Sequence, residues 1–339
     1  MIKRLFNRND NIAILIAGIF SIIIGLGVAR FAFTGLIPAM LDDYLTIKFV
    51  GILASLNFAG YLSGSIFSIF VKDINFKVYL YRFGIFLAIS TTFILAYSDN
   101  NTLWMVGRVL AGFAGAMCLI VGTSIVMQKL TIKSKTKAMG IHFSGIGFSI
   151  LTTDLLARFV LSLNYTWRDS WAVLAVFAII LSFYSVYILS FDKEVKQNAV
   201  KVKFDISIFT PFVIVLIIAY FTEGVGFVVQ ATFLPDIINN LKGLEGYGSL
   251  TWTLVGVAGI PSCIIWMLLA HRFGSSNIII IALLLQAVGI LIPAFSSNIY
   301  LNLLSGVLYG GTFIGLVALF MNLGGQLSRG NPVVLMGAM

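Results

Sequence analysis

The segment 96–112 reads AYSDNNTLWMVGRVLAG, and the segment 294–310 reads AFSSNIYLNLLSGVLYG. The two segments share 7 of their 17 residues at an offset of 198. Both are mostly apolar, and chance matches between apolar segments are common. The match therefore indicates an internal repeat only if the same offset recurs elsewhere in the chain.

The offset recurs in two further apolar segments. Residues 56–66 (LNFAGYLSGSI) and 255–265 (VGVAGIPSCII) share 4 of 11 residues at an offset of 199. A Gly-x-Gly pair at 25–27 returns at 224–226, again at an offset of 199. A nearly constant offset across three separate segments predicts that the chain contains two copies of one structural unit.

The composition indicates the solvent in which these copies fold. The 339 residues are 59% hydrophobic and 10% charged, and their mean hydropathy is +1.02. Soluble domains carry about 25% charged residues, so this chain has too little polar surface for a soluble protein. The same composition excludes a disordered chain, a collagen and a coiled coil. We expect a polytopic membrane protein. Cys118 and Cys263 both lie in apolar stretches, which implies no disulfide framework.

A membrane-spanning helix needs about 20 mostly apolar residues. The apolar runs of this chain are continuous and lack a ten-residue alternation, which predicts an all-α integral membrane protein rather than a barrel. An eleventh run begins at Val333 and is cut off at Met339. Ten complete spans are expected at 12–40, 49–71, 78–97, 102–128, 138–162, 171–191, 209–234, 250–270, 277–295 and 300–323.

The lysines and arginines predict the orientation of these spans. With a cytoplasmic N-terminus, 16 of the 22 fall on the inner side and 3 on the outer side, namely Lys48, Arg168 and Lys242. This asymmetry follows the positive-inside rule. We therefore expect a cytoplasmic N-terminus in the cytoplasmic (inner) membrane. The net charge of +9 then reflects topology and implies no nucleic-acid partner.

The repeat and the spans together predict the domain organisation. Residues 1–191 would form a six-helix bundle, 192–208 a basic cytoplasmic linker, and 209–339 a second bundle with the same orientation. The second copy stops after its fourth helix and the start of a fifth. We therefore expect two pseudo-symmetric six-helix bundles of which the second is truncated, with roughly 50–60 residues absent.

Two motifs show a resemblance to a known family. The segment Ala270–Gly274 (AHRFG), preceded by Gly259 and Pro261, resembles a loop motif of the major facilitator superfamily through Gly259, Pro261, Arg272 and Gly274. His271 stands where that motif usually has Asp. In the fourth span, Arg108-x-x-x-Gly112-x-x-Gly115 is similar to the Arg/Gly pattern of the superfamily's fourth helix.

Two further segments narrow the resemblance. GLGVARFAFTGLIPAM at 25–40 and GIHFSGIG at 140–147 resemble the bacterial YbfB/YjiJ-like subfamily. The glycine–proline pattern of drug antiporters in the fifth span is missing. The resemblance thus implies a transporter in which spans 1, 4, 7 and 10 line a central cavity, and it gives little support to a drug exporter.

Ionisable side chains inside the spans are costly and need an explanation. Arg30 shares a helix face with Thr34, and its planar guanidinium suits carboxylate or phosphate oxygens. Arg30 is therefore a candidate anion-binding group, and the alternative is a structural ion pair with another helix. The whole set of candidate substrate-binding residues is Arg30, Thr34, Arg108, Gln230 and Tyr309.

Glu223 lies near the centre of the seventh span, flanked by Gly224 and Gly226, with Gln230 two turns further on the same face. A carboxyl group held away from bulk water is suited to loading and releasing a proton. Glu223 is therefore a candidate proton-coupling residue. The alternative is a carboxylate permanently paired with Arg30 on the opposite half.

Arg108 and Asp154 are expected at similar depths in adjacent antiparallel spans. A structural charge pair between them is one interpretation. The other pairs Asp154 with Arg158 at i+4.

The leading functional hypothesis is a proton-coupled secondary transporter of a small organic solute, with anions as a candidate class. We expect a monomer with no enzyme activity, no cofactor and no metal, whose partners are the solute, the proton and the bilayer. The chain has no Gly-Lys dipeptide, hence no P-loop of the usual form. The alternatives are a lipid-modifying membrane enzyme and an inactive scaffold. Against the enzyme, neither His142 nor His271 is followed five residues later by Asp.

Cysteine labelling tests the orientation. Lys196→Cys, in a background with both native cysteines replaced by alanine, should react with an impermeant maleimide only from the cytoplasmic side. Lys242→Cys should react from the outside. Labelling of Lys196→Cys in intact cells would contradict the predicted topology.

Overall fold

The computed structural model describes residues 6–41, 43–71, 73–131, 135–190 and 209–327. Contacts divide the chain into two compact units, residues 1–197 and 198–339. The boundary falls within 192–208, the predicted linker, which lies outside the described residues, as does the predicted eleventh run beginning at Val333.

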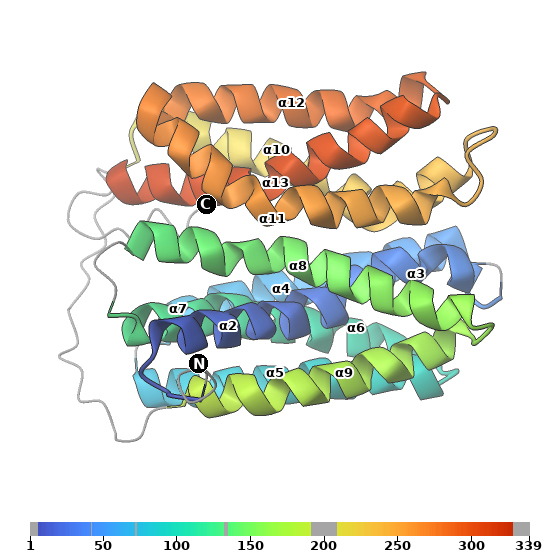
Figure 1. Cartoon of the computed structure of the whole chain (residues 1–339), viewed down its shortest axis with the longest axis horizontal. Helices are drawn as coiled ribbons and strands as arrows, with labels where there is room; N and C mark the ends of the chain where they lie inside the picture. The colour runs from blue at the N-terminus through green and yellow to red at the C-terminus, as the bar shows by residue number, and fades with distance from the viewer. Residues whose placement is uncertain (1–5, 42, 72, 132–134, 191–208, 328–339) are drawn as a thin grey trace. The chain divides into compact units, whose positions relative to one another are not determined.

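Ten helices in the described residues are long and apolar enough to cross a membrane, which is the number expected from the sequence (Figure 1). In the first unit two spans are interrupted by π-helical segments. The six spans of that unit are α2 (Asn11–Ile22) with η1 (Ile23–Phe31) and α3 (Ala32–Leu41), α4 (Ile47–Phe70), α5 (Ile74–Tyr97), α6 (Asn101–Ala116) with η2 (Met117–Val121) and α7 (Gly122–Lys129), α8 (Lys135–Ser162) and α9 (Trp167–Ile188). The second unit contains α10 (Pro211–Asn239), α11 (Tyr247–Phe273), α12 (Ser275–Phe295) and α13 (Ile299–Leu327).

Capping side chains explain why two helices begin four residues earlier than predicted. Asp73 Oδ2 accepts the Phe76 N–H at 2.7 Å, which starts α5 at Ile74. Thr166 and Asp169 form a reciprocal capping box, which starts α9 at Trp167. Side-chain acceptors of this kind replace the missing backbone partners of a first helical turn. An apolar run therefore locates the buried part of a span, whereas the cap decides where the helix begins.

The internal repeat is visible in hydrogen bonds at equivalent positions. Asn100 caps α6 by accepting two backbone N–H groups, and Asn298 does the same for α13. Four residues later, Trp104 and Asn302 each donate a side-chain N–H to the carbonyl six residues before them, both at 2.8 Å. The two copies thus share their local geometry even where the side chains differ.

The same helix crossing also occurs in both units. A Cβ added at Gly112 of α6 would collide with the Asn57 carbonyl oxygen of α4. A Cβ added at Gly310 of α13 would collide with the Val255 carbonyl oxygen of α11. Both pairs are related by an offset of 198, so one glycine-dependent crossing is repeated. Small residues allow helix backbones to approach this closely in a bilayer.

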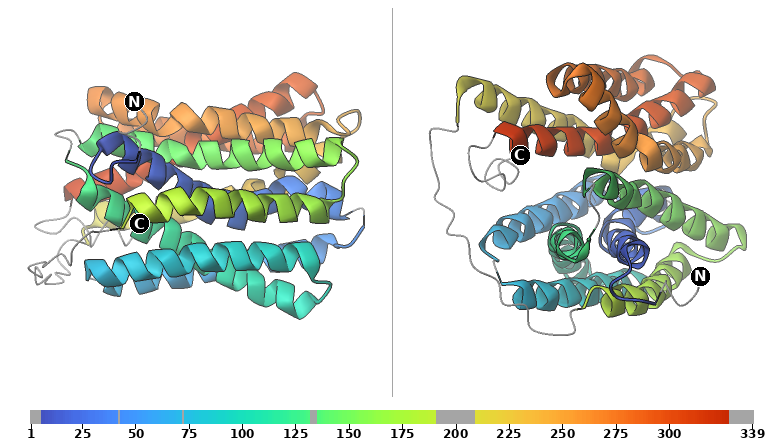
Figure 2. Two further views of the ribbon diagram at one scale, coloured as in Figure 1. Left: turned by 60° about the horizontal axis from the view of Figure 1, so that its bottom comes forward. Right: turned by 60° about the vertical axis from the view of Figure 1, so that its left-hand side comes forward.

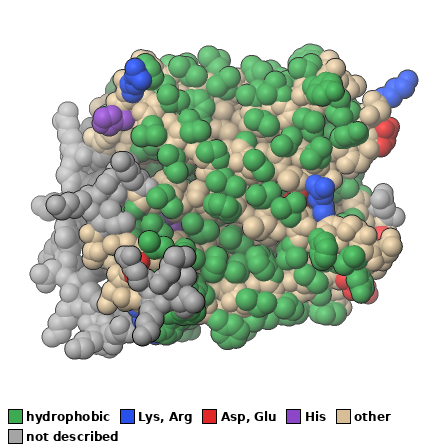
Figure 3. Space-filling view, viewed as in Figure 1, with side chains coloured by type: hydrophobic (Ala, Val, Ile, Leu, Met, Phe, Trp, Pro, Cys, Tyr) green, Lys and Arg blue, Asp and Glu red, His purple; other side chains and the backbone are tan. Residues whose placement is uncertain are grey.

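Side chains on the outside of both units are largely apolar. The face seen in Figure 3 is covered mostly by hydrophobic side chains, and most of its charged side chains lie toward helix ends. Phe86, Ile180 and Leu284 are examples of large exposed apolar residues. This distribution fits contact with lipid rather than with water.

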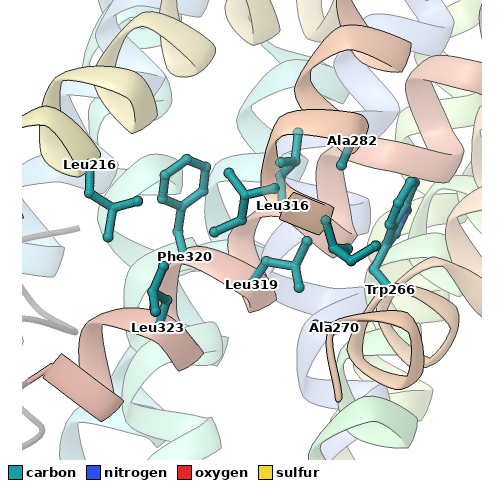
Figure 4. Packing of buried hydrophobic residues seen from close by; sticks show 10 residues of the cluster. Leu216, Trp266, Ala270, Ala282, Leu316, Leu319, Phe320 and Leu323 are labelled. Carbon is teal, nitrogen blue, oxygen red and sulfur yellow. The ribbon is translucent and has the colours of Figure 1, made fainter. Parts of the chain in front are cut away.

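Each unit also has a buried interior. In the first unit α5 and α9 pack side by side, as Figure 2 shows from two directions. In the second unit Leu316, Leu319 and Phe320 of α13 pack with Leu216 of α10 and Trp266 of α11 (Figure 4). The Trp266 Nε1–H donates to the Gly311 carbonyl at 2.6 Å, so its polar atom is satisfied within that packing.

The glycine crossing generates a stability prediction. Gly112→Ala should lower the free energy of unfolding by about 1–3 kcal/mol, because the added methyl meets backbone atoms that cannot move aside. Gly107→Ala in the same helix is the matched control: its nearest neighbour would be 3.7 Å from the added atom. Thermal unfolding in detergent measures both, and equal losses would contradict the prediction.

Candidate functional site

The centre of the first span is π-helical over Ile23–Phe31. Its glycines allow neighbouring helices to come close. A Cβ at Gly25 would collide with Cys118 of η2, and one at Gly27 would lie 2.9 Å from the Ser149 Cβ of α8. π-helical turns shift the backbone out of the α-helical hydrogen-bond register and occur often at functional sites. The segment 25–40, which resembles the YbfB/YjiJ-like subfamily, therefore begins in a π-helical turn. The hydropathy pattern did not predict this turn.

Arg108 of α6 holds this irregular turn. Its Nη1 donates to the Ala29 carbonyl of η1 at 3.0 Å, and its Nε donates to the Leu53 carbonyl of α4 at 3.5 Å. The guanidinium carbon also lies 4.3 Å from the centre of the Phe33 ring, and the residue is 2% exposed. Arg108 therefore connects three spans by donating to backbone carbonyls.

Asp154 forms an ion pair with Arg158 at 3.8 Å, the i+4 arrangement that the sequence left open. The Asp154 side chain is buried, whereas the Arg158 side chain is 39% exposed. The pair between Arg108 and Asp154 stays a prediction, because the contacts described for Arg108 are with carbonyl oxygens and an aromatic ring.

Arg30 lies near the end of η1, next to the residue whose carbonyl Arg108 binds. Its guanidinium carbon is 4.4 Å from the centre of the Phe58 ring and 5.5 Å from that of Tyr61, both on α4. Arg30 is half-buried, and Thr34 is fully buried. Aromatic rings contact the face of a guanidinium, whereas its N–H donors point outward in its plane. The stacking thus orients Arg30 without using its hydrogen-bond donors.

In the second unit, Glu223 of α10 accepts a hydrogen bond from the Gln286 amide of α12, with Nε2 and Oε1 2.8 Å apart. Glu223 is half-buried and Gln286 is 2% exposed. Gln230, which shares a helix face with Glu223, donates from Nε2 to the Ile290 carbonyl at 3.2 Å. The predicted residues Glu223 and Gln230 therefore both bind α12. The sequence patterns did not predict Gln286, although a glutamine within the apolar run of α12 is a usable signal.

Tyr309 of α13 also contacts α10. Its hydroxyl donates to the Phe227 carbonyl at 3.2 Å, and its ring stacks on that of Phe227 with centres 6.0 Å apart. The Phe313 ring contacts both of these rings, with its centre 5.2 Å from that of Tyr309 and 5.3 Å from that of Phe227. Tyr309 is thus part of an aromatic contact between α10 and α13.

The two copies of the Gly-x-Gly pair differ in structure. Around a Cβ added at Gly224 no atom of the described residues lies within 4 Å, and at Gly226 the nearest is Ile290 Cδ1 at 3.5 Å. α10 is α-helical throughout. The first span thus has both a π-helical turn and tight packing around its two glycines. α10 has neither of these features.

The residues of the loop motif occupy three positions. Gly259 and Pro261 lie inside α11, Arg272 is in its last turn, and Gly274 ends the helix with φ +90°. A positive φ of this size favours glycine, because a Cβ would be strained there. Gly274 therefore makes the sharp connection from α11 to α12.

The C-terminal end of the first span is fixed by an aromatic cluster. Trp167 donates from Nε1 to Asp43 at 2.9 Å, and Tyr44 donates to the Asp99 carbonyl at 2.8 Å. Partial burial, followed by the charge of Asp99, raises the pKa of Tyr44 above its ordinary value. Arg168 pairs with Asp99 and stacks on Trp167. The connections between spans 1 and 2, 3 and 4, and 5 and 6 are thereby joined to one another.

The described part of the chain contains no group of three or more His, Cys, Asp or Glu side chains that could hold a metal ion.

Comparison with known proteins identifies the family and the fold. The family model described as "Uncharacterised MFS-type transporter YbfB" matches residues 22–339. A comparison with curated proteins found no match. Two crystal structures of the nucleoside transporter NupG, one of them a mutant, are similar in fold, with TM-scores of 0.67 and 0.65 at 13% and 15% identity. Both matches cover 98% of this chain, and they cover 86% and 85% of the NupG chains.

Replacing Arg108 tests its role in holding the π-helical turn. Arg108→Lys should lower the free energy of unfolding by about 1.5–3 kcal/mol, since one ammonium group cannot reproduce the two guanidinium contacts. Arg158→Lys, which changes a partly exposed arginine, should have a small effect. Thermal unfolding of both variants is the measurement, and an unchanged Arg108→Lys midpoint would refute this role.

Proposed function

We propose that this chain, which belongs to the family of uncharacterised MFS-type transporters described as YbfB, is a proton-coupled secondary transporter of a small organic anion. Arg30 is the proposed anion-binding residue, and Glu223 is the proposed proton-coupling residue. The observation that carries this proposal is the Glu223–Gln286 hydrogen bond, which holds an ionisable group within a span by a neutral partner.

The surroundings of Arg30 support its role in anion binding. Phe58 and Tyr61 contact the guanidinium and fix its orientation, and the N–H edge is the part that recognises carboxylate or phosphate. Thr34 adds a hydroxyl one turn further along the helix. Within the second unit, Gln230 and Tyr309 are separately proposed as substrate-contacting residues. An oriented arginine loses less freedom on binding than a mobile one.

The surroundings of Glu223 support its role in proton coupling. Glu223 is half-buried within a span, and its described partner is an amide rather than a cation. A neutral partner does not hold the carboxyl group in its charged form as a salt bridge would. Glu223 is therefore suited to exchange a proton during transport.

We further propose that the chain lies in the cytoplasmic membrane with its N-terminus inside, on the basis of the 16-to-3 distribution of lysine and arginine.

Transport in proteoliposomes tests this function. Purified protein is first screened by thermal shift against monocarboxylates, dicarboxylates and phosphate monoesters. Nucleosides are included because NupG is a nucleoside transporter. The stabilising solute should then accumulate under a pH gradient. Glu223→Gln should abolish this accumulation while retaining exchange, because the amide preserves shape but carries no proton.

Arg30→Lys provides the second arm of the test. It should weaken binding of an anionic solute about tenfold, because a point charge does not reproduce the bidentate fork. Arg158→Lys is the control for a general loss of positive charge. Unchanged pH dependence in Glu223→Gln would exclude the proton-coupling role, and selective stabilisation by neutral solutes would exclude the anion role.

A further inference from the structure

Glu223 of α10 and Gln286 of α12 form a polar contact between two mostly apolar helices. The Gln286 Nε2 donates to the carboxyl group, while its Oε1 is buried and has no hydrogen-bond partner in the described part of the chain. A buried amide with one unpartnered end is costly. An apolar residue at this position would avoid that cost, so the glutamine calls for a functional explanation.

The chemistry of the Gln286 amide provides a functional explanation. A lysine at this position would favour the ionised carboxylate, and a leucine would favour the neutral acid. An amide offers both possibilities, because Nε2 donates and Oε1 accepts. Rotation by half a turn about the terminal torsion exchanges these two atoms, and that torsion is broad and roughly two-fold.

We propose that Gln286 is a positioning residue that binds Glu223 in both of its protonation states. It donates an N–H to the carboxylate and, after rotating, accepts the O–H of the carboxylic acid. Each orientation leaves one end of the amide without a partner. This inference rests on the proposed function of Glu223, and it adds how the proton is accommodated there.

The other titratable groups of the second unit can be named helix by helix. α12 has no titratable side chain among its residues, and α13 contributes the Tyr309 hydroxyl, which binds the Phe227 carbonyl. α10 itself has Tyr220, which stacks on Phe320, and α11 has Cys263. The remaining charged or titratable residues of the described part of this unit lie in connections or terminal turns: Asp236, Lys242, Glu245, Tyr247, His271, Arg272 and Tyr300.

Infrared spectroscopy of the full chain in phosphatidylcholine vesicles tests the proposal without a substrate. The C=O stretch of protonated carboxyl groups is followed as pH changes, and the Glu223 band is identified as the one that Glu223→Gln removes. Gln286→Leu should raise the pH of half-protonation by about one unit, a tenfold change in proton affinity, because the charge-assisted hydrogen bond that the carboxylate loses is stronger than the neutral one that the acid loses. The band should also move to higher wavenumber, because the acid loses its acceptor.

Ser305→Ala is the matched control. Its hydroxyl donates to the Gly289 carbonyl of α12 at 2.6 Å, so the change removes a buried hydrogen bond to the same helix without touching Glu223. The half-protonation pH and the band should both stay unchanged in this variant. Gln286→Met, which retains an unbranched side chain of similar length, repeats the test if the leucine variant does not fold.

The outcomes separate this inference from the proposed function. A changed half-protonation pH with an unchanged band position would mean that Gln286 binds only the carboxylate, and it would overturn the proposal. Unchanged values for both readouts would overturn it as well. If Glu223→Gln removes no titrating band at all, the proton-coupling role of Glu223 itself fails.

Discussion

Backbone carbonyls within a lipid-facing bundle must find donors inside the protein, and this requirement governs the first unit. A π-helical turn displaces carbonyls from the regular ladder, so such a turn needs donors from other helices. Arg108 supplies one to Ala29, and the Ser21 hydroxyl supplies another to Cys118 in the second π-helical segment, at 2.9 Å. The position of Arg30 depends on this arrangement, because it directly follows the carbonyl that Arg108 binds.

The repeat shows which features the two units share and which differ between them. The crossing at Gly112 returns at Gly310, so the backbone of the crossing helices is shared. Arg108 is replaced at the equivalent position by Gly306, whose added Cβ would meet the Thr251 carbonyl, the counterpart of Leu53. In the first unit the Leu53 carbonyl accepts a hydrogen bond from the Arg108 guanidinium. In the second unit the Thr251 carbonyl instead lies against the backbone of Gly306. The second unit accordingly contains no π-helical segment in its described residues.

The sequence predicted the features that depend on composition and periodicity. The ten spans follow from long apolar runs, and the family follows from residues such as Arg108, Gly112 and Gly274 that have fixed backbone roles. The π-helical segments could not be predicted, because the packing that accompanies them, such as that of Gly25 against Cys118, joins residues far apart in the chain. For the same reason, Asp154 had two candidate partners in sequence, and only the folded chain shows Arg158 against it.

Partner chemistry distinguishes the two ionisable residues proposed to act in transport, one in each unit. Arg30 is oriented by aromatic faces, which stabilise a permanent positive charge and leave its hydrogen-bonding geometry unchanged. Glu223 is held by an amide, which is neutral and can act as donor or acceptor. A group that keeps its charge requires a fixed surrounding, whereas a group that changes its charge requires a surrounding that suits both states. The proposed division of roles therefore follows from the chemistry of these neighbours as well as from the residues themselves.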